Sequence, residues 1–322
     1  MTEEIKKLKE LIDGTDNIVF FGGAGVSTES GIPDFRSVDG LYHQQWDDPP
    51  ETILSHTYYE RYPEKFFAFY RAKLLCEGAK PNAAHLKLAE WEKEGKLKAV
   101  ITQNIDGLHQ AAGSKNVLEL HGSTLRNYCE KCGKFYDVSY IKHSQGVPRC
   151  TCGGRIKPDV VLYEEGLDEK TLYRAVEYIQ EADVLIIAGT SLAVYPAAGL
   201  VRYYRGHKLV VINKTPLDRG LGADLVITGA VGETLPWPAS CRGRALRVPD
   251  HRLGALIVVN QSSPQTTETP AALRNCRGFR GKGGHDPQAN GKGANRFRST
   301  ALCPSTGGSI SACRAHTKPL HL

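Results

Sequence analysis

The pattern of apolar and polar residues predicts strands that alternate with helices along the first 235 residues. Short, largely apolar runs predict strands at 18–21, 98–102, 116–120, 184–188, 209–212 and 224–227. Apolar residues at helical spacing predict helices at 1–13, 81–94 and 169–182. Continuously apolar strands are typical of a parallel sheet that helices cover on both faces. The expected fold is therefore α/β, a Rossmann-like doubly wound parallel sheet.

Aromatic residues are concentrated in the segment 41–78, which we interpret as a small helical insertion. Phe66, Phe69 and Tyr70 share one helical face, and Pro63 stands near the start of that helix. Aromatic stripes of this kind usually form core and have no chemistry of their own. We therefore expect these residues to pack against the rest of the protein.

A glycine-rich turn, Gly22-Gly23-Ala24-Gly25, directly follows the first predicted strand. Glycine allows a sharp turn and lets a phosphate approach the backbone N–H groups. Two interpretations stay open here, a plain glycine turn and a cradle for a nucleotide diphosphate. The pattern differs from the usual dinucleotide fingerprint, because Thr28 replaces the third glycine and no strand ends in an acidic residue about 20 positions later.

Small or polar residues follow five of the predicted strands, at the point where each strand ends. In an open α/β sheet, ligands bind outside the carboxyl ends of the strands. So many polar strand ends predict one shared site. The segments are Gly22-Gly23, Gln103-Asn104-Ile105-Asp106, His121-Gly122, Gly189-Thr190-Ser191 and Asn213.

Four cysteines have the spacing of a zinc module. Cys129 and Cys132 form a knuckle, in which two thiolates reach one tetrahedral ion, and Cys150 and Cys152 follow as a second pair. The alternative, four unrelated reduced cysteines, does not explain the knuckle spacing. Four sulfur ligands leave no open position, so we expect one structural Zn²⁺. The module has few aromatic residues and scattered Lys and Arg, which does not favour nucleic-acid binding.

Composition and charge narrow the class of protein. The 322 residues are 41% hydrophobic, and no run of about 18 apolar residues predicts a membrane span. The first 13 residues lack the apolar stretch of a signal peptide, so we expect a cytoplasmic location, where thiols stay reduced. The segment 236–322 holds 13 of the 41 Lys and Arg and 3 of the 35 Asp and Glu, which gives it +10 and leaves −4 for residues 1–235. We therefore expect neither a membrane nor a nucleic acid as a partner of residues 1–235.

Several motifs, taken together in order and spacing, resemble the sirtuin family, and bacterial sirtuins in particular. The resemblance covers residues 5–234. It implies an NAD-dependent protein-lysine deacetylase with NAD as co-substrate and one structural Zn²⁺. The motifs are 23–27 with 30–36, Thr102-Gln103-Asn104-Ile105-Asp106-Gly107-Leu108-His109, His121-Gly122, the four cysteines, and Gly189-Thr190-Ser191-Leu192 with Val194-Tyr195-Pro196.

The resemblance also implies roles for individual residues. The pyrophosphate and ribose contacts would be Gly23, Ala24, Gly25, Ser27, Asp34 and Arg36, with Phe35 covering the nicotinamide pocket. The nicotinamide ribose and carboxamide would lie on Gln103, Asn104, Ile105, Asp106 and His121, and the adenosine half on Gly189, Thr190, Ser191, Asn213 and Val231. The catalytic residues would be His121, as the base, and Asn104. The substrate peptide would lie as an added strand between Val160, Val161, Leu162 and Tyr163 on one edge and Leu192 and Val194 on the other. The zinc ligands would be Cys129, Cys132, Cys150 and Cys152.

In the family, the acyl oxygen of the modified lysine attacks C1′ of the nicotinamide ribose, and a ribose hydroxyl that the base activates continues the transfer. The products would be nicotinamide, free lysine and O-acetyl-ADP-ribose. Two alternatives stay open, a protein mono-ADP-ribosyltransferase and a non-catalytic NAD or ADP-ribose binding module. His121, Asn104 and Asp106 argue against the module, since binding alone needs none of them. We interpret His85 and His109 as helix or surface histidines, and His143 likewise.

Three features depart from the family pattern. Tyr70 and Lys73 stand near the Tyr-x-x-Arg of a desuccinylating branch, and because Lys lacks the fork that holds a carboxylate, we expect neutral acyl groups, acetyl first. Glu164 stands where the family often has glycine, and we expect it to alter peptide choice. The segment 236–322 is rich in Arg, Gly, Ser, Thr and Pro. We expect it to be disordered and favour a frameshifted reading frame over a basic tail that contacts nucleic acid.

The expected domains follow from these motifs. A Rossmann-like NAD-binding domain would comprise 1–40, 79–125 and 155–235. The helical insertion at 41–78 and the zinc module at 126–154 would form a second, small domain.

Overall fold

The computed structural model describes residues 2–37, 40–43, 46–76, 78–217 and 220–235. All of them lie in one compact unit within residues 1–245. Among these residues, no helix is long and apolar enough to cross a membrane. The segment 236–322 lies outside the described residues, so the expected disorder and frameshift stay predictions.

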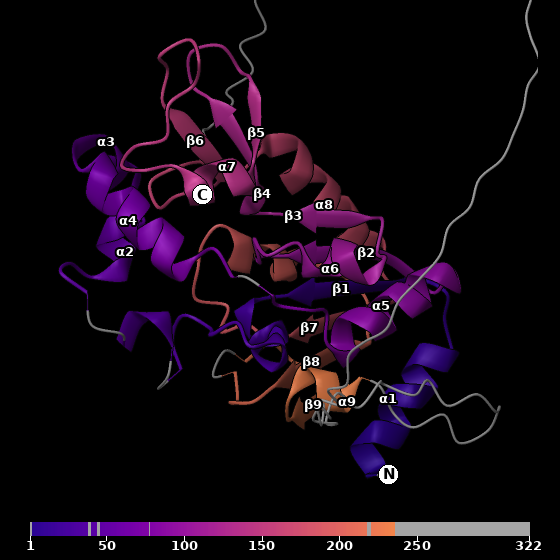
Figure 1. The fold of residues 1–322 in the computed structure, drawn as a ribbon. Coiled ribbons are helices and arrows are strands. Elements are labelled where there is room, and N and C mark those ends of the chain that lie inside the picture. The colour runs from indigo at the N-terminus through magenta and orange to yellow at the C-terminus, as the bar shows by residue number, and fades with distance from the viewer. Residues whose placement is uncertain (1, 38–39, 44–45, 77, 218–219, 236–322) are drawn as a thin grey trace, which may run out of the picture. The chain divides into compact units, whose positions relative to one another are not determined.

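Six parallel strands form the main sheet in the order β3-β2-β1-β7-β8-β9 (Figure 1). The strands β2 and β3 are added in turn on one side of β1, and β7, β8 and β9 are added in turn on its other side. The direction of winding therefore reverses between β1 and β7, and in such sheets ligands bind at this point. The strands are β1 (Ile18–Gly22), β2 (Leu97–Thr102), β3 (Val117–Glu119), β7 (Val184–Ala188), β8 (Leu209–Asn213) and β9 (Leu225–Thr228).

Alternate residues of β1 enter two different cores, one on each face of the sheet. Ile18 and Phe20 belong to the first core, and Val19 and Phe21 belong to the second. All four are completely buried, which explains why the strand reads as continuously apolar. The first face is covered by α1 (Glu3–Asp13), α5 (Ala83–Lys93) and α9 (Val231–Thr234), and the second by α8 (Glu169–Glu181) and the 3₁₀ helix Ala197–Tyr203. The doubly wound α/β fold is thus confirmed.

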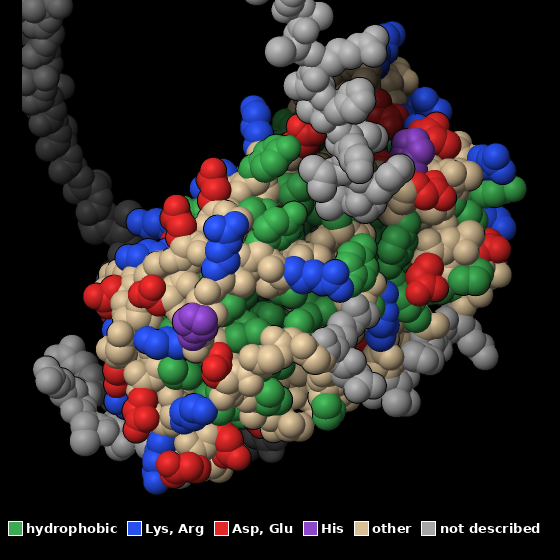
Figure 2. Space-filling view, turned by 180° about the vertical axis from the view of Figure 1, so that it is seen from behind, with side chains coloured by type: hydrophobic (Ala, Val, Ile, Leu, Met, Phe, Trp, Pro, Cys, Tyr) green, Lys and Arg blue, Asp and Glu red, His purple; other side chains and the backbone are tan. Residues whose placement is uncertain are grey.

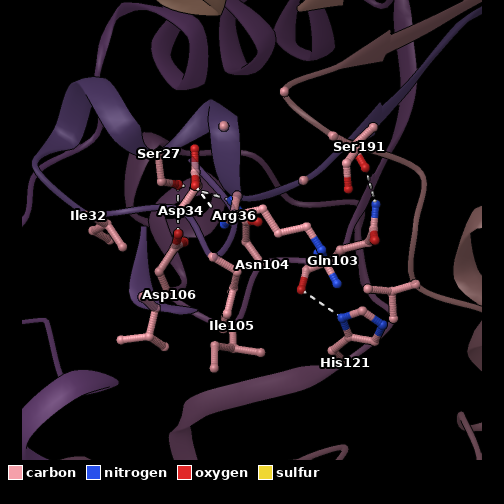
Figure 3. A pocket seen from close by; sticks show the side chains of 18 of the residues that line it. Ser27, Ile32, Asp34, Arg36, Gln103, Asn104, Ile105, Asp106, His121 and Ser191 are labelled. Carbon is pink, nitrogen blue, oxygen red and sulfur yellow. Dashed lines mark hydrogen bonds between the residues drawn. The ribbon is translucent and has the colours of Figure 1, made fainter. Parts of the chain in front are cut away.

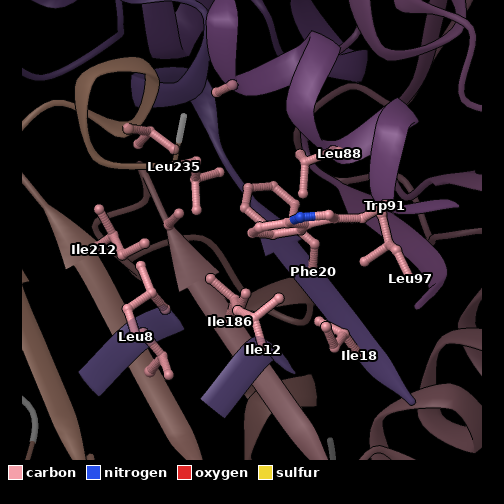
Figure 4. Packing of buried hydrophobic residues seen from close by; sticks show 14 of the residues in the cluster. Leu8, Ile12, Ile18, Phe20, Leu88, Trp91, Leu97, Ile186, Ile212 and Leu235 are labelled. Atoms are coloured by element: carbon pink, nitrogen blue, oxygen red, sulfur yellow. The ribbon is translucent and has the colours of Figure 1, made fainter. Parts of the chain in front are cut away.

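Figure 4 shows how the first core is packed. Leu8 and Ile12 of α1 reach the sheet from one helix, and Leu88 and Trp91 of α5 reach it from another, near Phe20 of β1. All five side chains are at most 2% exposed. The helical spacing of the apolar residues in both segments therefore marked a buried face, as expected.

A second sheet of three antiparallel strands has the order β5-β4-β6. The sequence pattern did not predict these strands or the helix beside them. In β4 the reason is a register shift in its pairing with β6 between Ser123 and Asn127, which breaks the alternation of buried and exposed residues. β5 has only three residues, and β6 contains Pro158, which argues against a strand. The elements are β4 (Gly122–Cys129), β5 (Phe135–Asp137), α7 (Val138–His143) and β6 (Ile156–Val160).

The aromatic segment forms the helices α2 (Pro50–Ile53), α3 (His56–Arg61) and α4 (Pro63–Lys73). Its buried side chains pack into one cluster with Ile141 of α7 and Ile156 of β6. The expectation that this helical insertion packs against the rest of the protein is confirmed, and the part that it packs against is the small sheet with α7. The division of the chain into two domains with the expected boundaries stays a prediction.

The three histidines that we set aside lie on helices. His85 of α5 and His109 of α6 (Leu108–Ala112) are buried, with ring centroids 4.7 Å apart, and His143 is exposed at the end of α7. Burial lowers the pKa of His85 to about 4 and that of His109 to about 3. Both rings are therefore neutral near pH 7 and contribute to the core.

Candidate functional site

A cavity of about 460 Å³ lies at the carboxyl ends of the strands on both sides of the switch point. This volume is within the range of about 300–1,000 Å³ that is typical of small-molecule sites. Each residue expected to bind NAD lines this cavity. Figure 3 shows several of them pointing toward one another from segments that are far apart in the sequence. The polar strand ends therefore line one cavity, and its role as a shared binding site stays a prediction.

The loops after β1 and β7 pack backbone against backbone. The N–H of Gly25 donates to the carbonyl oxygen of Gly189 at 2.8 Å. A Cβ atom on Gly25 would lie 2.8 Å from the Cα of Gly189, so a side chain does not fit there. The turn continues into the short 3₁₀ helices Ala24–Val26 and Thr28–Ser30. The glycines therefore form the floor of the cavity, with backbone at its surface.

A chain of hydrogen bonds fixes the orientation of Asn104. The Ser27 hydroxyl donates to Asp106 Oδ2 at 2.7 Å, so its oxygen accepts from Asn104 Nδ2 at 3.0 Å (Figure 3). Ser27 is 1% exposed and Asn104 is 8% exposed. Asn104 Oδ1 has no hydrogen-bond partner among the residues described here. Asp106 Oδ1 also accepts from the Leu108 N–H at 2.8 Å, so the same carboxylate satisfies the first backbone N–H of α6, which follows its N-cap residue Gly107.

His121 lies in the short connection between β3, an edge strand of the main sheet, and β4 of the small sheet. Its Nδ1 is 3.0 Å from the carbonyl oxygen of Gln103 (Figure 3). Because a carbonyl oxygen only accepts, Nδ1 carries the proton and Nε2 of the neutral ring is an acceptor. Burial lowers the pKa of His121 below its usual 6.5, and the bond to Gln103 opposes this effect.

Glycine follows His121 for a steric reason. Gly122 has φ +74°, and a Cβ atom at this position would overlap the carbonyl oxygen of Asp159 in β6. A backbone hydrogen bond also connects His121 to the loop 160–165, since the Val161 N–H donates to the His121 carbonyl oxygen at 3.0 Å.

The loop 33–37 brings a cation and an aromatic ring to the cavity. Asp34 Oδ1 accepts from the backbone N–H of Arg36 at 2.9 Å and of Ser37 at 2.7 Å, which folds the loop locally. The Arg36 guanidinium lies 5.2 Å from the ring centroid of Tyr42, and the Phe35 ring meets Tyr42 edge to face at 5.5 Å. The loop is thus held by contacts at its base, with Phe35 and Arg36 at the cavity wall.

Side-chain amides join three strand ends. Gln103 Nε2 donates to Thr190 Oγ1 at 3.0 Å, and Asn213 Nδ2 donates to the Thr190 carbonyl oxygen at 3.1 Å. These bonds connect the ends of β2, β7 and β8. The cavity wall therefore has fixed polar groups on either side of the glycine floor.

Five of the six residues expected to bind the substrate peptide line the cavity. They are Val160, Val161, Leu162, Tyr163 and Val194. The exception is Leu192, whose side chain is 1% exposed and packs into the second core of the main sheet. Its backbone has φ +51°, in the left-handed region. Its side chain is therefore not available to the peptide edge that the resemblance to the sirtuins assigns to this segment.

Sequence reasoning missed several residues of the cavity wall, among them Lys214 and Tyr42. Lys214 directly follows Asn213, so the rule of polar strand ends was sufficient to find it. Tyr42 carried no such signal, because its role depends on a long-range hydrogen bond between its hydroxyl and that of Tyr163. That bond connects the loop region after Arg36 to the loop 160–165.

The four cysteines form the expected cluster, with all sulfur atoms within 4.8 Å of one another. Three Sγ–Sγ distances are 3.5, 3.6 and 3.5 Å, for the pairs 129–152, 132–150 and 132–152. Four sulfurs at about 2.3 Å from a tetrahedral zinc ion lie about 3.7 Å apart, whereas a disulfide is about 2.05 Å long. The cluster therefore fits a structural Zn²⁺ and not a pair of disulfides.

The fold and the cavity define an α/β protein with a ligand site at the switch point and a four-cysteine zinc module. The sequence model of the Sir2 family matches residues 23–196. The NAD-dependent protein deacetylase of Clostridium perfringens (strain 13 / Type A) is 60% identical over 239 residues, which cover 73% of this chain and 98% of that protein. The chain belongs to the Sir2 family.

Solved structures of Sir2 enzymes share the fold. One, from work on the structural basis for their mechanism and regulation, has a TM-score of 0.67 and 42% identity and covers 73% of this chain and 96% of its own. Another, a complex of Sir2 with a p53 peptide and NAD⁺, has a TM-score of 0.64 and 39% identity, with the same coverage. The resemblance to the sirtuins drawn from the motifs is therefore confirmed.

Replacing one cysteine tests the zinc module. We expect Cys150→Ser to lower bound zinc from one ion per chain to nearly none, because the hydroxyl is a poor substitute for a thiolate. The melting temperature should fall as well, since metal binding in small zinc modules contributes about 10–16 kcal/mol to folding. Cys76→Ser, outside the cluster, is the matched control and should keep its zinc. Equal zinc content in both variants, measured by atomic absorption, would contradict the assignment.

Proposed function

We propose that this protein removes acetyl groups from lysine side chains of proteins or peptides with NAD as co-substrate, releasing nicotinamide, free lysine and O-acetyl-ADP-ribose. The observation that carries the proposal is the position of His121, at which the expected NAD residues and the loop 160–163 meet in one cavity. Relatives named NAD-dependent protein deacetylase support it, at 60% identity in the case quoted above.

The cavity wall fits NAD in charge and in shape. We infer that the Ala24 N–H and the Arg36 guanidinium hold the pyrophosphate, because a backbone N–H group and a cation suit an anion. The N–H groups of Gly23 and Gly25 already donate to the carbonyl oxygens of Ala188 and Gly189, so these two glycines contribute close backbone approach only. Thr190, Ser191 and Asn213 would hold the adenosine half, near Val231 at the start of α9. When bound, NAD supplies the nicotinamide–ribose bond, whose cleavage provides the acceptor for the acetyl group.

His121 would act as the general base through Nε2. The Gln103 carbonyl holds the proton on Nδ1, so that Nε2 accepts the proton of a ribose hydroxyl. The same bond stabilises the ring once it is charged, because Nδ1–H donates more strongly from an imidazolium. A neutral imidazole with a pKa below 6.5 is in its active form throughout the physiological range.

Asn104 would stabilise positive charge at the reacting ribose carbon. Its Oδ1 has no partner among the described residues, while its amide nitrogen donates to the Ser27 hydroxyl, which Asp106 holds in turn. A dipole that is already in place needs no reorganisation when the charge develops. Phe35 would keep water away from the same carbon.

The substrate peptide would lie between the loop 160–163 and Val194, with backbone hydrogen bonds on both sides. We propose acetyl as the preferred acyl group. Lys73 lines the cavity, and its ammonium lies 5.8 Å from the ring centroid of Trp46. An ammonium offers a point charge but no bidentate fork for an acyl carboxylate.

The proposal extends to location and partners. Four thiolates for one zinc ion need a reducing compartment, which supports a cytoplasmic location. Lys and Arg side chains are interspersed with Asp and Glu on the face in Figure 2, and the described residues there form no extended basic patch. This mixed charge supports protein substrates over nucleic acid.

Product analysis separates this proposal from its rivals. With an acetyl-lysine peptide and NAD, mass spectrometry should show loss of the acetyl group together with nicotinamide and O-acetyl-ADP-ribose. His121→Ala should lower kcat by about 10²–10⁴, the usual share of general base catalysis, and still bind NAD. ADP-ribose attached to protein would favour the transferase instead, and NAD binding without any turnover would favour a binding module.

The pH dependence tests the role of His121. Because the neutral ring is the active form and its pKa lies below 6.5, kcat/KM should rise along an acid limb with a midpoint below pH 6.5 and stay level through pH 7 to 8. His143→Gln, at an exposed position of α7, should leave this limb in place. A midpoint above pH 7 for the native enzyme would exclude the proposed ionisation.

A further inference from the structure

The backbone of Glu164 adopts a conformation that favours glycine. Its φ is +76°, and apart from Leu192 it is the only non-glycine residue with positive φ among the residues described. A side chain costs free energy in this region, since Cβ crowds the backbone. Glu164 therefore occupies a backbone position that favours glycine, and the contacts of its carboxylate offset part of this cost.

The Glu164 carboxylate is fixed by neutral partners. Oε2 accepts from the backbone N–H of Thr57 at 2.8 Å and from the Thr57 hydroxyl at 2.7 Å. These bonds lower the pKa of Glu164, so the group is ionised at neutral pH. The side chain is exposed, and Oε1 has no hydrogen-bond or ion-pair partner within the described part of the chain. His56 and Arg61 act on it only as more distant charges.

Glu165, the next residue, is a useful contrast. Its carboxylate is paired with Lys157 at 3.1 Å and with His56 at 2.9 Å, and it accepts from the Leu162 N–H at 2.9 Å. Its charge is thus neutralised within the protein. Of two adjacent carboxylates that line the cavity, Glu164 alone presents an uncompensated charge at the rim.

The backbone around Glu164 is also anchored. The Tyr163 N–H donates to the Leu54 carbonyl at 3.0 Å, and the His56 N–H donates to the Tyr163 carbonyl at 2.9 Å. The carboxylate therefore sits on a fixed loop, and little side-chain entropy is lost when it pairs with a substrate group.

We propose that Glu164 is a specificity residue that selects acetyl-lysine peptides with a Lys or Arg beside the acetyl-lysine. The proposal rests on the deacetylase function and peptide path proposed above. The carboxylate would pair with the ammonium or guanidinium of a flanking side chain and repel a flanking carboxylate. Because the pair is exposed, its effect is modest, on the order of tenfold in kcat/KM between cationic and anionic peptides.

Three matched peptides test the proposal, identical except that the residues flanking the acetyl-lysine on both sides are Lys, Gln or Glu. With the native enzyme, kcat/KM should fall in the order Lys, Gln, Glu, and the spread should shrink as salt screens the charges. Glu164→Gln keeps an oxygen that accepts from Thr57 but removes the charge, so the three peptides should then have similar kcat/KM values. Glu164→Lys should reverse it.

Glu169→Gln is the control, because Glu169 is an exposed carboxylate at the start of α8 outside the cavity. It should keep the native order. If Glu164→Gln deacetylates all three peptides with the native order, the specificity role is refuted while the deacetylase function stands. If the native enzyme turns over none of the three, the proposed function itself fails, and this inference fails with it.

Discussion

The backbone contact between Gly25 and Gly189 is the constraint on which the site depends. β1 and β7 are neighbours at the switch point of the sheet, so the loops that follow them must pass each other. They do so at a hydrogen-bond distance of 2.8 Å, which leaves no room for a Cβ atom between them. The contact closes the cavity floor with backbone and keeps side chains out of the space between the two loops.

The polar side chains of the cavity are oriented by hydrogen bonds to residues that are fixed in turn by the fold. Ser27 and Asp106 orient Asn104, and the Gln103 carbonyl orients His121. The small sheet contributes from the other side, because β4 begins directly after His121 and pairs with β6, which leads into the loop 160–165. The four cysteines include Cys129 of β4, so the zinc module stabilises the sheet that adjoins His121, the proposed base, and one edge of the proposed peptide path.

Local sequence pattern was sufficient for the main sheet and for the strand ends that line the cavity, whereas the loop 33–37 and the peptide edges came only from the resemblance to the sirtuins. Fully buried strands are apolar throughout, and parallel strands bring their carboxyl ends to one edge, so polar residues such as Asn213 marked the site without further knowledge. The pattern did not predict β4, where a register shift disrupts the alternation, nor the short strand β5 and the proline-containing strand β6. It did not predict the burial of Leu192 either. Contacts between distant segments, such as Thr57 with Glu164, are not encoded in any local pattern and require the fold.

Calorimetric titration of NAD into the native protein and into Gly25→Ala tests the central claim most directly. The added methyl group would push the two loops apart, so we expect NAD affinity to fall by at least about tenfold, the effect of about 1.4 kcal/mol. Gly166→Ala, whose Cβ would meet nothing within 4 Å, should bind like the native protein, and circular dichroism should show all three folded. Native affinity in a folded Gly25→Ala variant would show that the backbone contact between the two loops does not build the NAD site.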